Sequence, residues 1–328
     1  MTIQISVILS TYNRCRSLPA ALESVAAQVV PPSVEWEVIV VDNNSRDQTR
    51  EVVENFCRKN PTGRFRYLFE PRQGLSNARN AGIREARGEI IAFMDDDVTV
   101  EPAWLQNLTA SLHGGEWAGA GGRILPPQDF KPPRWLTLGG IMDSGGVLAL
   151  FDLGDVPGEL KKAPYGTNMA FRKSMFDKYG GFRTDLGRCG DSLIGNEDTE
   201  LGGRLMAGGE HLRYEPSAVV HHPVPKERLN KKYFLAWWFA YGHALVLERG
   251  TRPAILGIPR QFISIPNLVV RFLSVRTLRW LLALNPQRRF YNKCWVWKTA
   301  GEIVQIYHQS VEPKSAVQEI PSRNVKQK

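Results

Sequence analysis

Three consecutive carboxylates, Asp95, Asp96 and Asp97, follow the apolar segment 90–94. Adjacent carboxylates repel one another unless a cation or solvent lies between them. Mg²⁺ and Mn²⁺ are bound in proteins by one or two carboxylates together with phosphate oxygens. The triplet therefore predicts a divalent cation held against a diphosphate, with a solvated acidic turn as the alternative.

Two other polar clusters also follow apolar segments. Thr11, Tyr12, Asn13 and Arg14 come after residues 3–9, and Asp42 opens a second cluster that ends at Ser45. A carboxylate such as Asp42 can accept hydrogen bonds from a ribose or a base edge. A turn or a helix N-cap is the alternative interpretation of this second cluster.

Strand and helix patterns alternate through the first hundred residues. Strands are predicted over 3–9, 37–41, 65–69 and 90–94, and helices over 18–28, 48–58 and 75–86. This alternation predicts right-handed βαβ units and an α/β fold with a Rossmann-like, mostly parallel central sheet flanked by helices. Ligands of such sheets bind beyond the carboxyl ends of the strands. We therefore expect the three polar clusters to converge there.

The segment 126–164 is rich in Pro and Gly, and a loop of this length is usually a lid or a binding loop. A strand over 165–172, a helix over 197–206 and a short strand over 217–222 are predicted after it. The first turn of this helix contains Glu197 and Asp198. Acidic residues are favoured there by the helix dipole, and a carboxylate fixed there could also act as a general base.

His221 and His222 occupy the last predicted strand. Side chains alternate between the two faces of a strand, so at most one of the two is expected to face the site. A neutral imidazole could complete a metal site containing Asp97. A packed or exposed histidine pair is the alternative.

Six sequence blocks, taken in order, resemble the successive motifs of family 2 glycosyltransferases. The blocks are residues 6–14, 40–45, 74–80, 93–97, 166–172 and 196–201. The resemblance spans residues 3–225 and implies a GT-A fold and an inverting, metal-dependent transferase that uses a nucleotide sugar. The acidic run stops at Val98, where many family members have another Asp, but its first and third positions are intact.

The resemblance also implies roles for individual residues. Asp198 would be the general base, and Asp97 with His222, in preference to His221, would hold Mg²⁺ or Mn²⁺. The residues implied to bind the donor are Thr11, Tyr12, Asn13, Arg14, Asp42, Arg79, Asp95 and Asp96. Those implied to shape the donor-sugar and acceptor pocket are Gly166, Thr167, Asn168, Met169 and Glu197. The resemblance favours a UDP-sugar donor and a glycan or lipid-linked acceptor in surface polysaccharide biosynthesis.

The 328 residues are 43% hydrophobic and 23% charged, which excludes a disordered or collagen-like chain. Residues 1–225 carry a net charge of −4, whereas residues 226–328 carry +13. We expect a catalytic domain over 1–225, a basic helical extension over 226–311 and a disordered tail over 312–328. The four scattered cysteines predict reduced thiols, and no basic leader precedes the first strand, so a cytoplasmic location is expected.

The basic extension has no uncharged apolar run of the ~18–20 residues that a spanning helix needs. Residues 267–284 have an amphipathic pattern, with Arg271, Arg276 and Arg279 on one face and Trp280 among the leucines of the other. Such a helix can lie in the plane of an anionic membrane, here the inner face of the cell membrane. Packing on the catalytic domain is the alternative.

Parts of the sequence are also compatible with two other functions. A nucleotidyltransferase also needs acidic metal ligands, but no Gly-rich, Lys- or Arg-bearing loop lies near the start of the chain. A nucleic-acid-binding protein could use the basic last third. The acidic first part and the absence of a recognised nucleic-acid module argue against nucleic acid as a partner.

Overall fold

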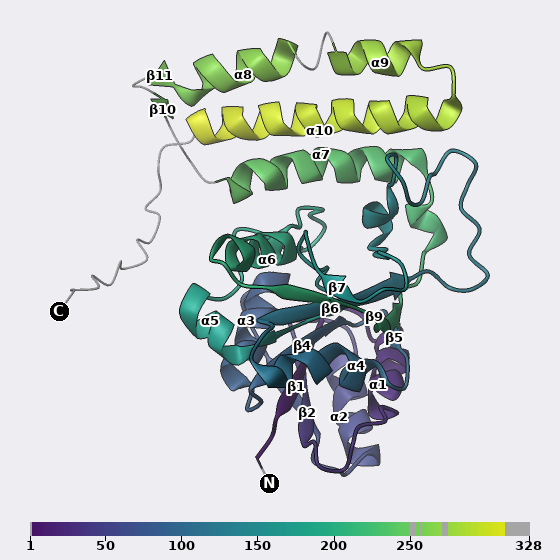
Figure 1. The fold of residues 1–328 in the computed structure, drawn as a ribbon, viewed down its shortest axis with the longest axis vertical. Coiled ribbons are helices and arrows are strands. Elements are labelled where there is room, and N and C mark those ends of the chain that lie inside the picture. The colour runs from purple at the N-terminus through teal and green to yellow at the C-terminus, as the bar shows by residue number, and fades with distance from the viewer. Residues whose placement is uncertain (1, 250–253, 256–257, 271–274, 312–328) are drawn as a thin grey trace, which may run out of the picture.

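The computed structural model describes residues 2–249, 254–255, 258–270 and 275–311. The predicted disordered tail, 312–328, lies outside the described residues. Figure 1 shows an α/β body with a stack of helices on one side of it. The strands of the body are β1 Ile5–Thr11, β2 Trp36–Asp42, β3 Phe65–Phe69, β4 Ile90–Asp95, β5 Thr99–Val100, β6 Gly119–Leu125, β7 Gly158–Glu159, β8 Met169–Arg172 and β9 Leu212–His221.

The described strands of the body form one sheet in the order β3-β2-β1-β4-β8-β6-β9-β5, with β7 paired to β9. The half made of β3, β2, β1 and β4 is parallel, and β1 and β2 are buried along their whole length, as is usual for strands of a parallel sheet. In the other half β8 is antiparallel to both β4 and β6. The register pairs Thr11 with Asp42 and Ser10 with Asp95, so the carboxyl ends of β1, β2 and β4 meet at one edge.

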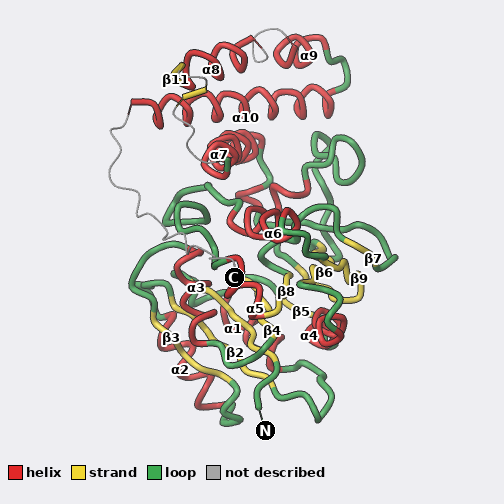
Figure 2. The backbone as a smooth tube through the Cα atoms, turned by 60° about the vertical axis from the view of Figure 1, so that its left-hand side comes forward, coloured by secondary structure: helices red, strands yellow, loops and turns green. Residues whose placement is uncertain are grey.

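Helices flank this sheet on both sides (Figure 2), as the strand–helix alternation predicts. The helix α1 packs its buried Leu18, Leu22 and Val25 into the main core beside the sheet. The helices of the body are α1 Leu18–Ala26, α2 Thr49–Lys59, α3 Leu75–Glu85, α4 Trp104–Thr109, α5 Lys173–Tyr179 and α6 Glu197–Ala207.

Two strand predictions differ from the structure. The strand expected over 165–172 is confined to β8, because the Asn168 amide nitrogen donates to the Tyr165 carbonyl and closes a turn before it. The last strand is longer than expected, since β9 begins at Leu212 rather than at Ser217. The turn before β8 directs residues 165–167 toward the carboxyl edge of the sheet.

The chain after the body forms a layered stack in which α7 lies nearest the body, α10 lies on α7, and α8 and α9 lie on α10 (Figure 1). Close packing of α7 on α10 depends on two glycines, because a Cβ on Gly242 would lie 2.1 Å from the Lys298 carbonyl oxygen and one on Gly301 would lie 2.1 Å from that of Phe239. The elements of this part are α7 Lys231–Glu248, β10 Ala254–Ile255, β11 Ile258–Pro259, α8 Arg260–Val270, α9 Thr277–Leu282 and α10 Pro286–Val311.

The Pro- and Gly-rich segment 126–164 is anchored to this stack. Its Leu136, Val147 and Leu148 share a second hydrophobic core with α7 and α10. The Trp135 ring also makes edge contacts with Phe234 of α7 at 5.0 Å between ring centres and with a phenylalanine of α10. The segment expected to be a lid or a binding loop is therefore part of a packed interface between the body and the helical stack.

The single amphipathic helix predicted over 267–284 is divided between α8, which ends at Val270, and α9, which begins at Thr277. Arg271 lies outside the described residues. Arg276 packs on α10, where its guanidinium lies 4.6 Å from the ring centre of Trp295 and donates to the Trp295 carbonyl oxygen. Among the described residues, no helix is both long and apolar enough to cross a bilayer.

Candidate active site

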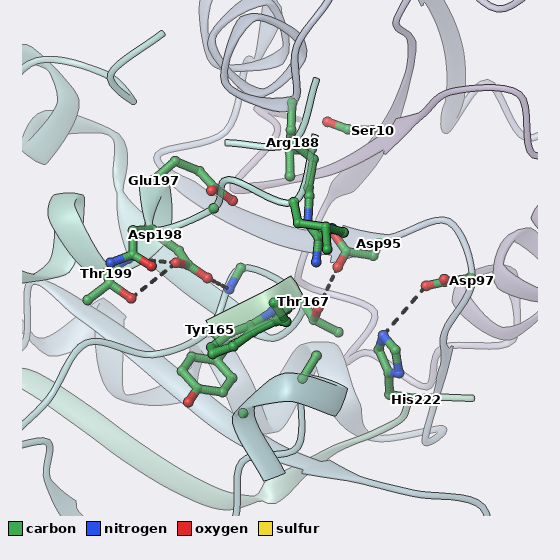
Figure 3. Close-up of a pocket in the computed structure, with 18 of the residues that line it drawn as sticks. Ser10, Asp95, Asp97, Tyr165, Thr167, Arg188, Glu197, Asp198, Thr199 and His222 are labelled. Atoms are coloured by element: carbon green, nitrogen blue, oxygen red, sulfur yellow. Dashed lines mark hydrogen bonds and ion pairs between the residues drawn. The ribbon is translucent and has the colours of Figure 1, made fainter. Parts of the chain in front are cut away.

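A cavity of ≈ 660 Å³ lies at the carboxyl edge of the sheet, between the body and α7. Figure 3 shows Asp97 and His222 at one end of it, Glu197, Asp198 and Thr199 at the other, and Thr167 between them. These residues lie just after β4 and β9, in the first turn of α6 and in the turn before β8, which the sheet topology brings together.

The acidic triplet lies at the end of β4, as the apolar segment 90–94 before it predicts. Asp95 accepts a hydrogen bond from the Thr167 hydroxyl, and Asp97 lies 3.9 Å from the Arg14 guanidinium. Burial, together with the adjacent charge of Asp97, raises the pKa of Asp96 to about 7. The triplet is thus a place where a cation would relieve electrostatic repulsion.

His222, rather than His221, faces the acidic triplet. Its Nε2 lies 3.9 Å from Asp97 Oδ1, and its Nδ1 lies 2.7 Å from the Pro223 carbonyl oxygen. A carbonyl can only accept, so Nδ1 carries a proton, and it is Nε2 that lies on the side of Asp97. His221 lies on the other side of the strand, where its Nε2 is 2.7 Å from Glu101 Oε1.

These residues fit a divalent cation that is completed by phosphate oxygens. Asp97 and His222 offer one oxygen and one nitrogen toward a common point. No group of three His, Cys, Asp or Glu side chains within the described ranges is arranged to hold a metal alone. Mg²⁺ and Mn²⁺ are commonly held by few protein ligands together with substrate phosphates. The buried Ser10 hydroxyl, which has no hydrogen-bond partner, also lines the cavity.

Asp198 is held in a fixed orientation at the start of α6. Its Oδ2 accepts from the Gly166 amide nitrogen at 2.7 Å, and its Oδ1 accepts from the Thr199 amide nitrogen at 2.6 Å. The preceding Asn196 adopts the left-handed conformation, with φ of 72°, which turns the chain into the helix. Oδ1 also accepts from the Thr199 hydroxyl at 3.3 Å, whereas Oδ2 keeps a further lone pair with which the group can accept a proton inside the cavity.

Arg79, which the resemblance implies to bind the donor, lines the cavity, but its guanidinium is paired with two carboxylates. Its guanidinium is buried, with Nη1 2.7 Å from Glu197 Oε1 and Nη2 3.3 Å from Asp95 Oδ1. A Cβ on Gly166 would lie 2.3 Å from Arg79 Nη2, so only glycine lets the turn before β8 cross this ion pair. Burial and the charge of Asp198 raise the pKa of Glu197, whereas the charge of Arg79 lowers it.

Two residues expected at the donor site do not line the cavity. Asp42 is 2% exposed, and its two oxygens accept from the Ser45 amide nitrogen and the Tyr67 hydroxyl. This is the turn-forming alternative for the second cluster. Asn13 joins the two loops, since its Oδ1 accepts from the Arg46 amide nitrogen at 2.8 Å. Thr11, Tyr12 and Arg14 do line the cavity.

Two residues expected in the sugar pocket are structural. The Asn168 side chain is fully buried, where it accepts from Trp104 Nε1 and donates to the carbonyl oxygens of Arg123 and Ala218. Met169 lies in the hydrophobic core. Gly166, Thr167 and Glu197 line the cavity, although the carboxylate of Glu197 is paired with Arg79. Strand alternation cannot apply to residues 166–168, because they form a turn.

The profile of the glycosyl transferase family 2 matches residues 6–180 of this chain. The chain belongs to this family. It is 30% identical over 237 residues, 72% of this chain and 71% of the relative, to the succinoglycan biosynthesis protein ExoM of Rhizobium meliloti. It is 28% identical to the glucosyl-dolichyl phosphate glucuronosyltransferase of Haloferax volcanii, over 73% of this chain and 76% of the relative.

The fold of this family 2 glycosyltransferase is also found in a solved structure at low sequence identity. The mannosyltransferase PcManGT of Pyrobaculum calidifontis, in complex with GDP-Man and Mn²⁺, superposes with a TM-score of 0.59 at 20% identity. The match covers 94% of this chain and 87% of the other. The central sheet and its flanking helices are therefore those of a GT-A glycosyltransferase.

Sequence reasoning missed the aromatic wall of this glycosyltransferase's cavity. Trp237, Trp238 and Tyr241 of α7 line the side opposite the sheet, and Tyr165 lies in the same cavity. The rings of Trp237 and Tyr241 are nearly parallel, at 19° and 5.2 Å between centres. The signal that could have found the wall is the density of aromatic residues over 233–241.

Basic side chains were missed as well. Lys162, Arg188 and Arg228 line the cavity together with Arg14, and they come from three separate segments of the chain. None lies in a sequence block that resembles a family motif, so only the fold indicates that they share one space. Cationic groups in a cavity with an acidic triplet favour an anionic ligand that is bound together with a divalent cation.

Proposed function

We propose that this family 2 glycosyltransferase transfers a sugar from a nucleoside diphosphate donor to a hydroxyl of a glycan or lipid-linked acceptor, with inversion at the anomeric carbon. The observation that carries the proposal is the shared cavity, with a cation-binding pair at one end and an oriented carboxylate at the other. The relationship to ExoM supports a role in polysaccharide biosynthesis.

The donor diphosphate belongs at the end with Asp97 and His222. These two residues would hold Mg²⁺ or Mn²⁺, which stabilises the negative charge that develops on the departing nucleoside diphosphate. Arg14 and Arg228 line the same cavity and add positive charge for the phosphates. The Mn²⁺ and GDP-Man in the structure of PcManGT support this class of donor and cation. The sequence resemblance favours a UDP-sugar.

Asp198 is the proposed general base. Its carboxylate takes the proton from the acceptor hydroxyl as the acceptor oxygen bonds to the anomeric carbon. The bond between that carbon and the diphosphate oxygen breaks, and its electron pair leaves with the diphosphate. This single displacement inverts the anomeric configuration and needs no second carboxylate as nucleophile. The backbone hydrogen bonds to Asp198 fix the orientation of the carboxylate that receives the proton.

The aromatic wall of α7 is the proposed place of the acceptor. Aromatic rings offer apolar faces for the C–H groups of a sugar, and polar neighbours fix its hydroxyls. Trp237 and Tyr241 lie in the same cavity as Asp198, together with the polar Asp143 and Ser144 of the anchored segment. An acceptor sugar packed on this wall would present a hydroxyl to the base.

The test measures nucleoside diphosphate release from a panel of UDP-, GDP- and dTDP-sugars, with Mg²⁺, with Mn²⁺ or with chelator. We expect one base and one sugar to be preferred, and chelator to abolish release. Glycans and polyprenyl-linked sugars serve as trial acceptors. NMR of the product should show a β-linkage when the donor is α-linked. Retention of configuration would contradict the proposed displacement, and release of pyrophosphate would indicate a nucleotidyltransferase.

A further inference from the structure

The outermost helices of the stack, α8 and α9, expose large apolar side chains. Leu284 is 97% exposed and Leu282 is 68% exposed, values typical of polar side chains. On α8 the exposed positions 262, 263, 266, 267 and 270 fall on one helical face, which carries no charged residue. The term apolar surface is used below for six exposed side chains, those of Phe262, Ile263, Leu278, Leu281, Leu282 and Leu284.

Packing on α10 directs the leucines of α9 outward. The Trp280 ring makes an edge contact with Trp297 of α10, with 6.2 Å between ring centres. The Lys293 ammonium lies 5.2 Å from the Trp280 ring and 5.0 Å from the Trp297 ring. Because Trp280 is held on α10 in this way, Leu278, Leu281 and Leu282 lie on the remaining sides of the short helix and stay exposed.

The charge around the apolar surface has one sign. Residues 258–311 contain eight Lys or Arg and a single acidic residue, Glu302. Glu302 is buried and lies 3.1 Å from the Lys298 ammonium, so it does not offset the outer charge. Arg279 is exposed on α9 itself, and Arg288 and Arg289 are exposed at the start of α10. The combination is complementary to a surface that is anionic outside and apolar beneath.

We propose that the apolar surface of α8 and α9 docks this glycosyltransferase on an anionic phospholipid membrane. The leucines and Phe262 would enter the boundary between headgroups and acyl chains, while Arg279 and Arg288 would contact lipid phosphates. A second copy of the chain fits less well, because a twofold contact would bring the arginines of both copies together. Since α7 and α8 lie on opposite sides of α10 (Figure 1), docking would hold the cavity away from the bilayer by the thickness of this stack.

The test uses the full chain and sedimentation with vesicles of phosphatidylcholine, with or without phosphatidylglycerol. The triple variant Leu278→Ser, Leu281→Ser, Leu282→Ser should have a partition coefficient onto the anionic vesicles that is lower by about tenfold or more. The matched control is Val29→Ser with Val156→Ser, which removes exposed apolar side chains from the body and should bind like the wild type. Thermal unfolding of both variants shows whether they remain folded.

A second variant separates charge from apolar contact. Arg279→Gln, Arg288→Gln and Arg289→Gln together should weaken binding at low salt and reduce its salt dependence, because fewer lipid phosphates are engaged. The proposal is overturned if the wild type does not bind anionic vesicles at low salt, or if the leucine variant binds them equally well. It is also overturned if sedimentation velocity shows that the leucines hold two copies together. None of these measurements requires substrate, so they do not depend on the proposed function.

Discussion

Arg79 Nη1 lies 2.7 Å from Glu197 Oε1, although 118 residues separate the two in the chain. The pair joins α3 to the first residue of α6, directly before the proposed base. Both side chains are buried, and Asp95 is the second partner of the guanidinium. The ion pair thus connects the acidic triplet at one end of the cavity with Asp198 at the other.

Replacing Arg79 should therefore destabilise the protein strongly. Arg79→Met leaves Glu197 buried without its cation, which typically costs about 3–5 kcal/mol of the free energy of unfolding. Arg84→Met on the same helix is the matched control, because Arg84 is 56% exposed where it pairs with Glu70. Loss of such an exposed pair costs about 1 kcal/mol or less. Urea denaturation measures both, and equal losses would contradict the structural role of Arg79.

Asp97→Ala should abolish metal-dependent binding of the nucleotide sugar, because it removes the carboxylate nearest His222. His222→Gln should weaken the same binding, whereas His221→Gln should leave it nearly unchanged, since His221 faces Glu101 instead. Calorimetric titration of the donor with and without Mn²⁺ measures these effects. Unchanged metal dependence in Asp97→Ala would show that the cation is held elsewhere.

Asp198→Asn should leave donor binding largely intact and lower the transfer rate by about 10²–10⁴-fold, the usual loss for a missing general base. The amide has the same shape but cannot take up the proton. Steady-state kinetics with saturating donor measure the rate, and donor titration serves as the control for folding and binding. Turnover close to that of the wild type would exclude Asp198 from this role.

Trp237→Ala should raise the KM for the acceptor and leave donor binding unchanged, because the ring lines the cavity from α7. Trp237→Phe keeps an aromatic face and should retain most of the acceptor affinity. Hydrolysis of the donor in the absence of acceptor provides the internal control. If both variants changed donor hydrolysis alone, the wall would belong to the donor subsite.

Gly301→Ala should weaken the packing of α7 on α10, because the added Cβ would lie 2.1 Å from the Phe239 carbonyl oxygen. We expect a loss of about 1–3 kcal/mol, as for other overpacked contacts. Gly203→Ala in α6 is the matched control, since a Cβ there meets no atom within 4 Å. The control should be stabilised by about 0.4–1 kcal/mol, because alanine restricts the unfolded chain. Thermal or urea unfolding measures the change in the free energy of unfolding, which should have opposite signs in the two variants.

The sequence predicts much of the α/β body because its information is local. Apolar strands that alternate with amphipathic helices specify a parallel half-sheet, and β3 spans the residues predicted for it. The place of the acidic triplet follows from the same rule, since parallel strands end at one edge. The membership of family 2 adds the order of the motifs. None of these inferences requires knowledge of contacts between distant residues.

The tertiary structure decided which polar residues face the cavity and which make hydrogen bonds within the folded body instead. Asp42 and Asn168 stand within the recognised motifs, yet their hydrogen bonds are taken by Tyr67 and Trp104 from other segments. Strand alternation predicted that one histidine of the pair would face the site, but only the packing of β9 beside β6 and β5 selected His222. The aromatic wall depends on α7 being folded back over the sheet, so no pattern within the helix reveals it. Local periodicity fixes the elements, whereas the partners of each polar group depend on contacts across more than a hundred residues.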